Sequence, residues 1–313
     1  MAALVCGSLA YDTVMVYPGR FRDHILPDKI HLLNVSFVVP TLRRYFGGCA
    51  GNIAYNLRLL DCDGHAMGTV GHDFGPYREW MEKNAMSTRH VKVLDDEYTA
   101  QAYITTDLDA NQLTAFHPGA MTHSWRQQVP TDGSITIGVC APDGSEGMIA
   151  HASQFASAGI PFIFDPGQAM TLFGGPELAT FVEQATWVTV NDYEATLLEE
   201  RTSLSTGELA ARVEAYVVTR GAEGSIVHTG GRRVEIPAVR AAAVVDPTGC
   251  GDAYRAGLVY GLERGLDWET TGRIASLMGA IKIAVRGTQN HTFTKAEFAE
   301  QYRAAFGEAL RAA

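Results

Sequence analysis

The residues best suited to chemistry lie in one short segment, 241–261 (AAAVVDPTGCGDAYRAGLVYG). A β-branched run ends at Asp246, a glycine-rich turn follows, and apolar spacing predicts a helix that begins near Asp252. Glycines at 249 and 251 allow main-chain amides to point toward one centre at the positive end of that helix, which makes an anion hole. A carboxylate at its edge repels phosphate and is suited to accept a proton from a group that attacks bound phosphate. Asp252 is therefore the candidate base, although an acid in a first helical turn is also a common stabilising choice.

A second polar group lies within residues 45–56 (YFGGCAGNIAYN). A Gly-Gly pair precedes a predicted helix whose first turn carries Asn52, and this side chain can bond hydroxyl groups as donor and as acceptor. A glycine turn with an asparagine at the helix start is also frequent for structural reasons alone. Asp12, just past the first predicted strand, suits a pair of sugar hydroxyls, or an ordinary turn.

Two further motifs follow predicted strands. Residues 191–194 (NDYE) have carboxylates that can organise Mg²⁺ through water, or they cap a helix. Residues 219–224 (TRGAEG) hold too few glycines for a dinucleotide fingerprint and are by themselves a weak nucleotide loop. The chain has no G-x-x-x-x-G-K-[ST] motif, and its Asp-Phe-Gly at 73–75 occurs without an H-R-D loop. These absences exclude a P-loop enzyme and a protein kinase.

Composition restricts the classes of protein that remain. The 313 residues are 46% hydrophobic, which suffices for a sizeable core, and the net charge of −10 disfavours nucleic-acid and membrane partners. No apolar run approaches the roughly 18 residues of a membrane span. The first residues lack the basic region of a secretory signal, and the 5 cysteines form no C-x-x-C pair. We therefore expect a cytoplasmic protein without disulfides.

Short apolar runs alternate with helix-period segments along most of the chain. This alternation predicts an α/β fold, a doubly wound, mostly parallel sheet flanked by helices. The predicted strands are 3–9, 65–71, 135–140, 160–164, 187–190 and 215–219, and the predicted helices are 50–61, 77–84, 146–158, 177–184, 193–200 and several between 251 and 312. In such sheets ligands bind at the carboxyl ends of the strands.

Two segments, residues 13–46 and 98–117, break the alternation. Neither contains a good helix; the first includes the apolar run 34–40 (NVSFVVP), and the second reads as two β segments around a turn. We interpret them together as a small β lid on an α/β core domain of residues 1–12, 47–97 and 118–313. Ordinary surface hairpins fit the pattern about equally well.

The motifs, taken together, resemble those of a known family. The pair FGGCAGN (46–52) and DPTGCGD (246–252) is similar to the two signatures of the ribokinase-like (PfkB-type) sugar and nucleoside kinases. Further matches occur in the family's order and extend the resemblance over essentially the whole chain: Gly7, Asp12, the step 71–75 (GHDFG), the N-x-x-E motif 191–194 and the T-x-G-x-x-G loop 219–224.

The resemblance implies transfer of the γ-phosphoryl group of ATP, with Mg²⁺, to a primary hydroxyl. Asp252 would be the catalytic base beside an anion hole of Gly249, Cys250 and Gly251. On the substrate side it implies Ser8, Asp12, Gly47, Gly48, Asn52 and Phe116, and on the ATP side Asn191, Thr219, Gly221, Gly224 and Asn290. Asn191 and Glu194 would order Mg²⁺ through water, and Asp246 and Thr248 would shape a site for a monovalent cation such as K⁺. Cys250 stands where the family commonly has alanine, a position that acts through its backbone.

The acceptor is inferred from the lid and from two short runs. The lid carries an apolar set that can face a purine, or simply pack between β segments: Phe37, Val38, Val39, Tyr103, Leu113 and Phe116. Residues 165–168 (DPGQ) and 287–291 (GTQNH) resemble bacterial and archaeal nucleoside kinases, which favours adenosine, phosphorylated at its 5′-hydroxyl to AMP. The alternatives are a ribose- or fructose-type sugar kinase and a non-catalytic nucleotide-binding regulator. The expected partners are ATP and a small nucleoside or sugar, and a monomer and a homodimer both stay open.

Overall fold

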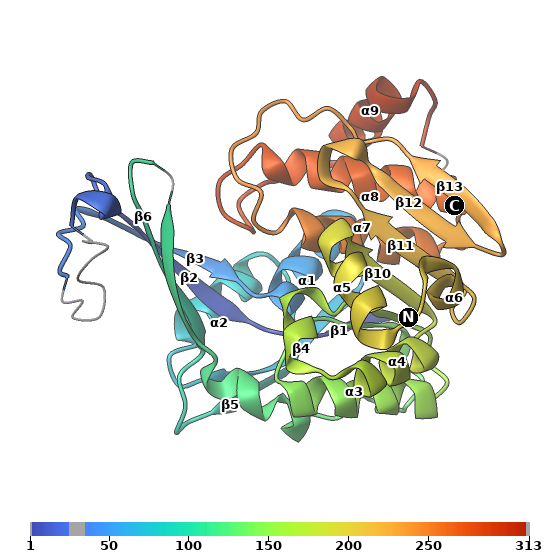
Figure 1. Cartoon of the computed structure of the whole chain (residues 1–313), viewed down its shortest axis with the longest axis horizontal. Coiled ribbons are helices and arrows are strands. Elements are labelled where there is room, and N and C mark those ends of the chain that lie inside the picture. Colours follow the sequence, from blue (N-terminus) through green and yellow to red (C-terminus); the bar gives the residue numbers. More distant parts are fainter. Residues whose placement is uncertain (1, 25–34, 110, 311–313) are drawn as a thin grey trace.

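The computed structural model describes residues 2–24, 35–109 and 111–310 (Figure 1). Residues 25–34 and 110 of the predicted lid, and 311–313 at the end of the predicted helical region, lie outside this description. The described chain contains a nine-stranded sheet, ordered β13-β12-β11-β10-β9-β8-β1-β4-β5, and a separate four-stranded sheet, ordered β3-β2-β6-β7.

The large sheet is parallel from β5 to β11 and ends in an antiparallel hairpin. Its strands are β1 (Ala2–Cys6), β4 (Gly64–Gly71), β5 (Ser87–Leu94), β8 (Ile135–Cys140), β9 (Phe162–Phe164), β10 (Trp187–Asn191), β11 (Ala215–Thr219), β12 (Ser225–Thr229) and β13 (Arg232–Ile236). The chain passes from β1 to β4 and β5 on one side and returns to β8 on the other. The strand order therefore reverses at β1, where an open α/β sheet has its binding crevice.

Helices cover both faces of this sheet, which confirms the predicted doubly wound α/β fold. One face carries α1 (Cys49–Leu59), α2 (Gly75–Lys83), α7 (Cys250–Glu263), α8 (Trp268–Ile283) and α9 (Lys295–Phe306), and the other α3 (Ser145–Ser157), α4 (Gly175–Gln184), α5 (Asp192–Thr202) and α6 (Thr206–Ala210). Strand β1 shows how the sequence serves two cores: Ala3 and Val5 enter the first, and Leu4 and Cys6 the second. Within the described ranges, no helix has the length and apolar character needed to cross a bilayer.

The small sheet extends away from the helices and the large sheet (Figure 1). It consists of β2 (Ala10–Val16), β3 (Thr41–Gly47), β6 (Ala100–Thr106) and β7 (Gln112–His117), so both segments that break the α/β alternation contribute strands to it. Asp73, in the turn after β4, fastens this sheet to the core. Its carboxylate accepts hydrogen bonds from the Thr99 amide at 2.7 Å and from the Gln101 side chain at 3.0 Å. The division of the chain into core and lid stays a prediction.

Several predicted elements differ from the structure. The strand predicted over 3–9 ends at Cys6, and a new strand begins at Ala10 in the other sheet. The β-branched run before Asp246 is a loop with Val244 79% exposed, because it pairs with no strand: the amides of Val245 and Asp246 donate to the Ile283 carbonyl. The sequence patterns missed the polar strand β5, the edge hairpin β12–β13 and the short helix α6.

The predicted lid run also differs, where it is described. Residues 35–40 form no strand. Phe37 packs instead against the rings of Tyr17 and Phe21, at centroid distances of 4.7 and 5.1 Å. This ring therefore takes part in local hydrophobic packing, and that it faces a purine stays a prediction.

Candidate active site

The two glycine-rich signatures meet at the carboxyl end of the large sheet. Helices α1 and α7 pack together and both begin there, and the Asn52 side chain donates a hydrogen bond from Nδ2 to Asp252 Oδ2 at 2.8 Å. This contact joins residues that are 200 positions apart in the sequence. The predicted base therefore lies at the predicted crevice and touches the other signature.

A network behind Asn52 holds that amide in place. Gln289 donates from Nε2 to Asn52 Oδ1 at 3.0 Å and to the Tyr77 hydroxyl at 2.6 Å, and it accepts from Trp80 Nε1 at 3.0 Å. Because Asn52 Oδ1 is bound to a donor, its Nδ2 must face Asp252. The sequence patterns did not single out Gln289, Tyr77 or Trp80; the GTQNH run was noted only as a likeness.

Two glycines permit the close approach of β1, β2 and α1. Gly48 has φ +84°, and a Cβ there would lie 2.5 Å from the Ser8 carbonyl oxygen. At Gly47 a Cβ would lie 2.5 Å from an Asp12 carboxylate oxygen. Any side chain at either position would displace the backbone or the Asp12 carboxylate, which explains the Gly-Gly pair.

The anion hole differs in one residue from the prediction. Residues 247–250 form a turn in which the Cys250 amide donates to the Pro247 carbonyl at 3.1 Å, and Gly249 has φ +79° and ψ 4°, the values of a type II turn. The Cys250 amide therefore closes the turn instead of facing an anion. Gly251 and Asp252 follow in the first helical turn, where amides have no partner within the helix, and together with the Gly249 amide they are left for a phosphate.

Burial shifts the acidity of two carboxyl groups at this site. It raises the pKa of Asp252 to about 6; Asp165 adds to this rise, while the Asn52 hydrogen bond and the Arg255 charge oppose it. Burial, with the charges of Asp252 and Asp246, also raises the pKa of Asp12 to about 6. The proton affinity of Asp252 is thus higher than that of an ordinary aspartate, which suits a general base.

We expect kcat/KM to fall on the acid side of about pH 6, because only the ionised Asp252 can accept a proton and its pKa is raised to that value. The measurement is a pH–rate profile with the acceptor below saturation. An acid limb near the ordinary aspartate pKa of 3.8 would contradict the raised value. In a variant without this carboxylate, any acid limb that remains reports Asp12, whose pKa is also raised to about 6.

A buried ion pair lies beside the base. Arg255, three residues after Asp252 on α7, forms a double hydrogen bond with Asp165, Nε to Oδ2 at 3.0 Å and Nη2 to Oδ1 at 2.8 Å. Both side chains are buried, with 7% and 4% of their surfaces exposed. A Cβ at Gly251 would lie 2.8 Å from Arg255 Nη1, so the guanidinium lies directly behind the anion hole. The sequence patterns predicted neither the pairing of these two side chains nor their position behind the anion hole.

The residues predicted on the ATP side lie at the ends of neighbouring strands. Asn191 ends β10, and Thr219 ends β11 and donates to the Val190 carbonyl at 3.3 Å. Gly221 and Gly224 flank the turn into β12, with φ +54° and +84°. Asn290 does not join this group in the structure, because its exposed side chain donates to the Arg286 carbonyl at 2.9 Å.

Asn191 and Glu194 form a reciprocal helix cap. The Asn191 side chain accepts from the Glu194 amide at 2.8 Å, and Glu194 Oε2 accepts from the Asn191 amide at 2.8 Å. The capping interpretation is therefore correct for this motif. Burial raises the pKa of Glu194, and the Asp165 charge contributes, so a cation near this carboxylate would be stabilising.

Two predicted substrate residues have other partners in the structure. The Ser8 hydroxyl accepts from the Cys49 amide at 3.0 Å and so serves the start of α1. Phe116 lies on β7 of the small sheet, opposite Ala102, and is 51% exposed. Two further apolar residues of that sheet are also open to solvent, Tyr103 at 40% and Leu113 at 45%.

The metal ions can be tested against the residues present. Within the described ranges no group of three or more His, Cys, Asp or Glu could hold a metal. Mg²⁺ needs no such cage, because it is usually bound by one or two carboxylates, water and substrate phosphates, a set that Glu194 fits. The predicted K⁺ position beside Asp246 and Thr248 does not fit, because the ammonium of Lys282 bonds to the Asp246 carbonyl at 2.8 Å.

Two cysteines begin the helices of the site. Cys49 is the first residue of α1 and Cys250 the first of α7. Burial, together with the Asp252 charge, raises the pKa of the Cys49 thiol, and burial raises the pKa of the Cys250 thiol to about 11. Neither thiol is therefore a nucleophile at neutral pH, and Asp252 is the group at this point that takes protons.

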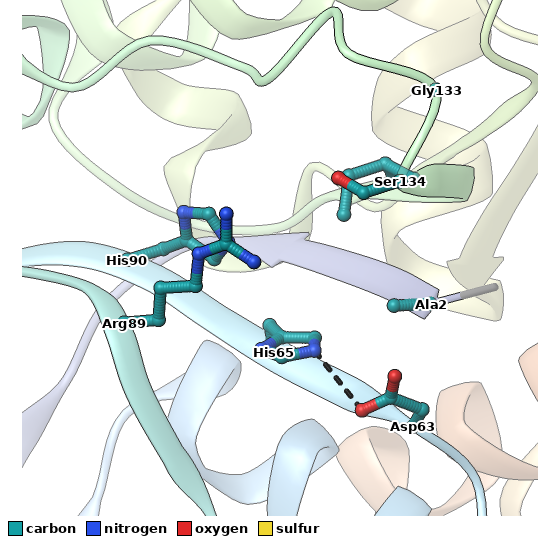
Figure 2. A pocket seen from close by; sticks show the side chains of 8 residues that line it. Ala2, Asp63, His65, Arg89, His90, Gly133 and Ser134 are labelled. Carbon is teal, nitrogen blue, oxygen red and sulfur yellow. Dashed lines mark ion pairs between the residues drawn. The ribbon is translucent and has the colours of Figure 1, made fainter.

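A separate pocket of about 240 Å³ lies at the opposite edge of the large sheet (Figure 2). It is lined at the amino ends of β1, β4 and β8, where the ring of His65 pairs with Asp63 at 3.0 Å. Arg89 and His90 lie on its other side (Figure 2). The amino ends of parallel strands lie on the side of the sheet opposite their carboxyl ends. This pocket is therefore remote from Asp252 and is not part of the site.

Comparisons with known proteins agree with this geometry. A family model described as pfkB family carbohydrate kinase matches residues 9–295. The structure of Burkholderia thailandensis nucleoside kinase in complex with inosine has a TM-score of 0.90 and 51% identity, and covers 98% of this chain and 99% of that one. Its complex with ADP-inosine has a TM-score of 0.88 and 52% identity, with 100% and 98% covered. A nucleoside kinase of Methanothermobacter thermautotrophicus is 30% identical over 291 residues, 91% of this chain and 94% of that protein. These likenesses confirm the predicted ribokinase-like fold.

Proposed function

The chain belongs to the pfkB family of carbohydrate kinases, whose members are ATP-dependent phosphotransferases that act on hydroxyl groups, and on that premise we propose that it is a nucleoside kinase. The proposed acceptor is the 5′-hydroxyl of a purine nucleoside, adenosine or inosine. The observation that carries the proposal is the hydrogen bond between Asn52 and Asp252, which unites the two signature motifs around one carboxylate. The likeness to a kinase whose structures contain inosine supports the class of acceptor.

Asp252 acts on the acceptor in the proposed reaction. The 5′-hydroxyl oxygen forms a bond to the γ-phosphorus of ATP, the bond to the β-bridging oxygen breaks, and the hydroxyl proton passes to the Asp252 carboxylate. The products are the nucleoside 5′-phosphate and ADP. Asn52 donates its hydrogen bond to Oδ2 of Asp252, which leaves Oδ1 of Asp252 for the acceptor. The amides of Gly251 and Asp252, in the first turn of α7, and the positive end of that helix stabilise the transferring phosphoryl group.

Mg²⁺ fits the nucleotide side of the site. Glu194 and Asn191 would hold it through water, and the ion, when bound, would neutralise charge on the phosphates. Arg255, behind the anion hole, is paired with Asp165 and so contributes no isolated positive charge there. The loop from Thr219 to Gly224 lies at the end of the neighbouring strand and would follow the ATP phosphates.

Asp12 is the proposed ligand of the ribose hydroxyls. It lies on β2 beside Gly47, and its pKa is raised by burial and then by Asp252, so the two carboxylates are electrostatic neighbours. Hydroxyl groups that donate to Asp12 would stabilise its ionised form. Phe116 is the exposed apolar residue proposed to cover the base, because the strand register places it on the face of the small sheet that carries Asp12. Tyr103 and Leu113 lie on the other face of that sheet.

A panel of acceptors tests the proposal. With Mg-ATP, we expect purified protein to release ADP with adenosine and inosine at kcat/KM values at least about tenfold above those with free ribose or fructose, since the lost base contacts weaken transition-state binding. The measurement is coupled ADP release, with identification of the phosphorylated product. Turnover of a free sugar without turnover of any nucleoside would instead establish the sugar-kinase alternative.

A further inference from the structure

The side chain of Lys282 ends in an unusual place. It is the last but one residue of α8, its side chain is fully buried, and its ammonium lies under the turn that precedes Asp252. Nζ donates to the Asp246 carbonyl at 2.8 Å and to the Val285 carbonyl at 3.3 Å, and Asp246 Oδ2 lies 4.0 Å away. A buried charge is costly unless it is paired and hydrogen-bonded, and these three oxygens supply such partners.

The same oxygens belong to two segments that form the site. Asp246 begins the turn of the anion hole: its Oδ1 accepts from the Thr248 amide at 3.0 Å, and its Oδ2 accepts from the Gly287 amide at 2.8 Å. Val285 and Gly287 lead into Gln289, which holds Asn52. Lys282 therefore ties together the segment that carries the base and the segment that orients it.

The groups around the ammonium are acidic or uncharged, so Lys282 is the cation of this cluster. The acidic and thiol groups that face the ammonium are Asp246, Cys250 and Asp252. The nearby ring of His291 is neutral, because burial and then the Lys282 charge lower its pKa to about 4. A second cation bound to the Asp246 and Val285 carbonyls would lie against the ammonium and be repelled.

We propose that the Lys282 ammonium takes the place of a bound monovalent cation in this chain, so that the site is organised without K⁺. The inference rests on the proposed function for its kinetic readout. Lys282 touches no reacting atom and acts as a positioning residue: it fixes the two carbonyls and, through them, the turn before Asp252. The predicted K⁺ requirement is then absent from this chain because the cation is covalently part of it.

The first test uses the unaltered protein. We expect initial rates and the melting temperature to be the same in K⁺, Na⁺ and choline chloride at equal ionic strength, with less than about a twofold change in rate. Saturable activation by K⁺ over choline, or a melting temperature raised by K⁺ alone, would overturn the proposal. The melting temperature needs no substrate, so it separates failure of this inference from failure of the proposed function.

The second test removes the ammonium. In Lys282→Ala, kcat should fall by about tenfold or more with a smaller change in KM, because the base is displaced while the nucleoside contacts remain. The shortened side chain leaves space, so added K⁺ or ethylammonium should restore a large part of the rate, and choline should not. Full activity of the variant without added cation, or a loss that neither cation restores, would overturn the proposal.

Two controls accompany this variant. Lys92→Ala removes a lysine whose ammonium is exposed and bonds to a single carbonyl, that of Arg126, at 3.4 Å, and we expect neither a loss of rate nor a cation response. Lys282→Met keeps the length of the buried side chain without its charge. If Lys282→Ala fails to fold, Lys282→Met should still show the loss of kcat, whereas wild-type kcat in Lys282→Met would overturn the proposal.

Discussion

Asp252→Asn is expected to lower kcat by about a hundred to ten thousand-fold, which is the usual contribution of a positioned general base. The substituted amide has nearly the same shape, and its oxygen can still accept the hydrogen bond that Asn52 donates at 2.8 Å in the unaltered protein. What is lost is the capacity to take the proton of the acceptor hydroxyl. The measurement is ADP release at saturating nucleoside and Mg-ATP.

Binding and a matched control complete this experiment. Nucleoside affinity, measured by calorimetry, should be retained in Asp252→Asn, because the asparagine still fills the site. Glu146→Gln removes an exposed acid from the first turn of α3 and should leave kcat unchanged. If Asp252 served only to stabilise a first helical turn, both variants would lose under about 1 kcal/mol of stability and neither would lose turnover.

Asp165→Ala is expected to destabilise the protein by about 3 to 5 kcal/mol, because it leaves the Arg255 guanidinium buried and unpaired. In the structure this guanidinium is held by two hydrogen bonds of 3.0 and 2.8 Å and has almost no exposed surface. The measurement is the free energy of unfolding in urea. Because Asp165 also raises the pKa of Asp252, the acid limb of the rate profile should move to lower pH in any Asp165→Ala protein that stays folded.

The control for Asp165 is an exposed ion pair. Arg233 and Glu235 approach to 2.9 Å, but more than half of each side chain is exposed. Glu235→Ala should therefore change stability by no more than about 1 kcal/mol. Equal effects of the two substitutions would show that the buried pair has access to water or that Arg255 finds another acceptor.

Much of the fold can be predicted from the periodicity of apolar residues, because the strands and helices pack into two hydrophobic cores, one on each face of the large sheet. The parallel strands are continuous apolar runs, as β11 (AYVVT) shows, and the helices between them repeat at helical spacing. The patterns failed where a strand is half exposed or polar. β5 (STRHVKVL) and β13 (RRVEI) carry exposed charged residues, and the run before Asp246 is apolar without being buried.

The site was predictable where glycine and a polar side chain share a short segment. Gly48, Gly249, Asn52 and Asp252 have local signals, and the structure brings them together. The side chains that support them have no local signal, since their roles depend on contacts across the chain. Gln289 meets Asn52 from 237 positions away, and Asp165 meets Arg255 from 90 positions away.

The two cysteines at the starts of α1 and α7 differ from reactive cysteines in how they respond to oxidation and alkylation. A helix start ordinarily favours the thiolate, which is the form that peroxide and alkylating reagents attack. Here burial overrides that tendency at Cys49 and Cys250, with the neighbouring carboxylate adding to the effect at both. The protein thus keeps two sulfur atoms at its site in the thiol form, which reacts least with peroxide and alkylating reagents.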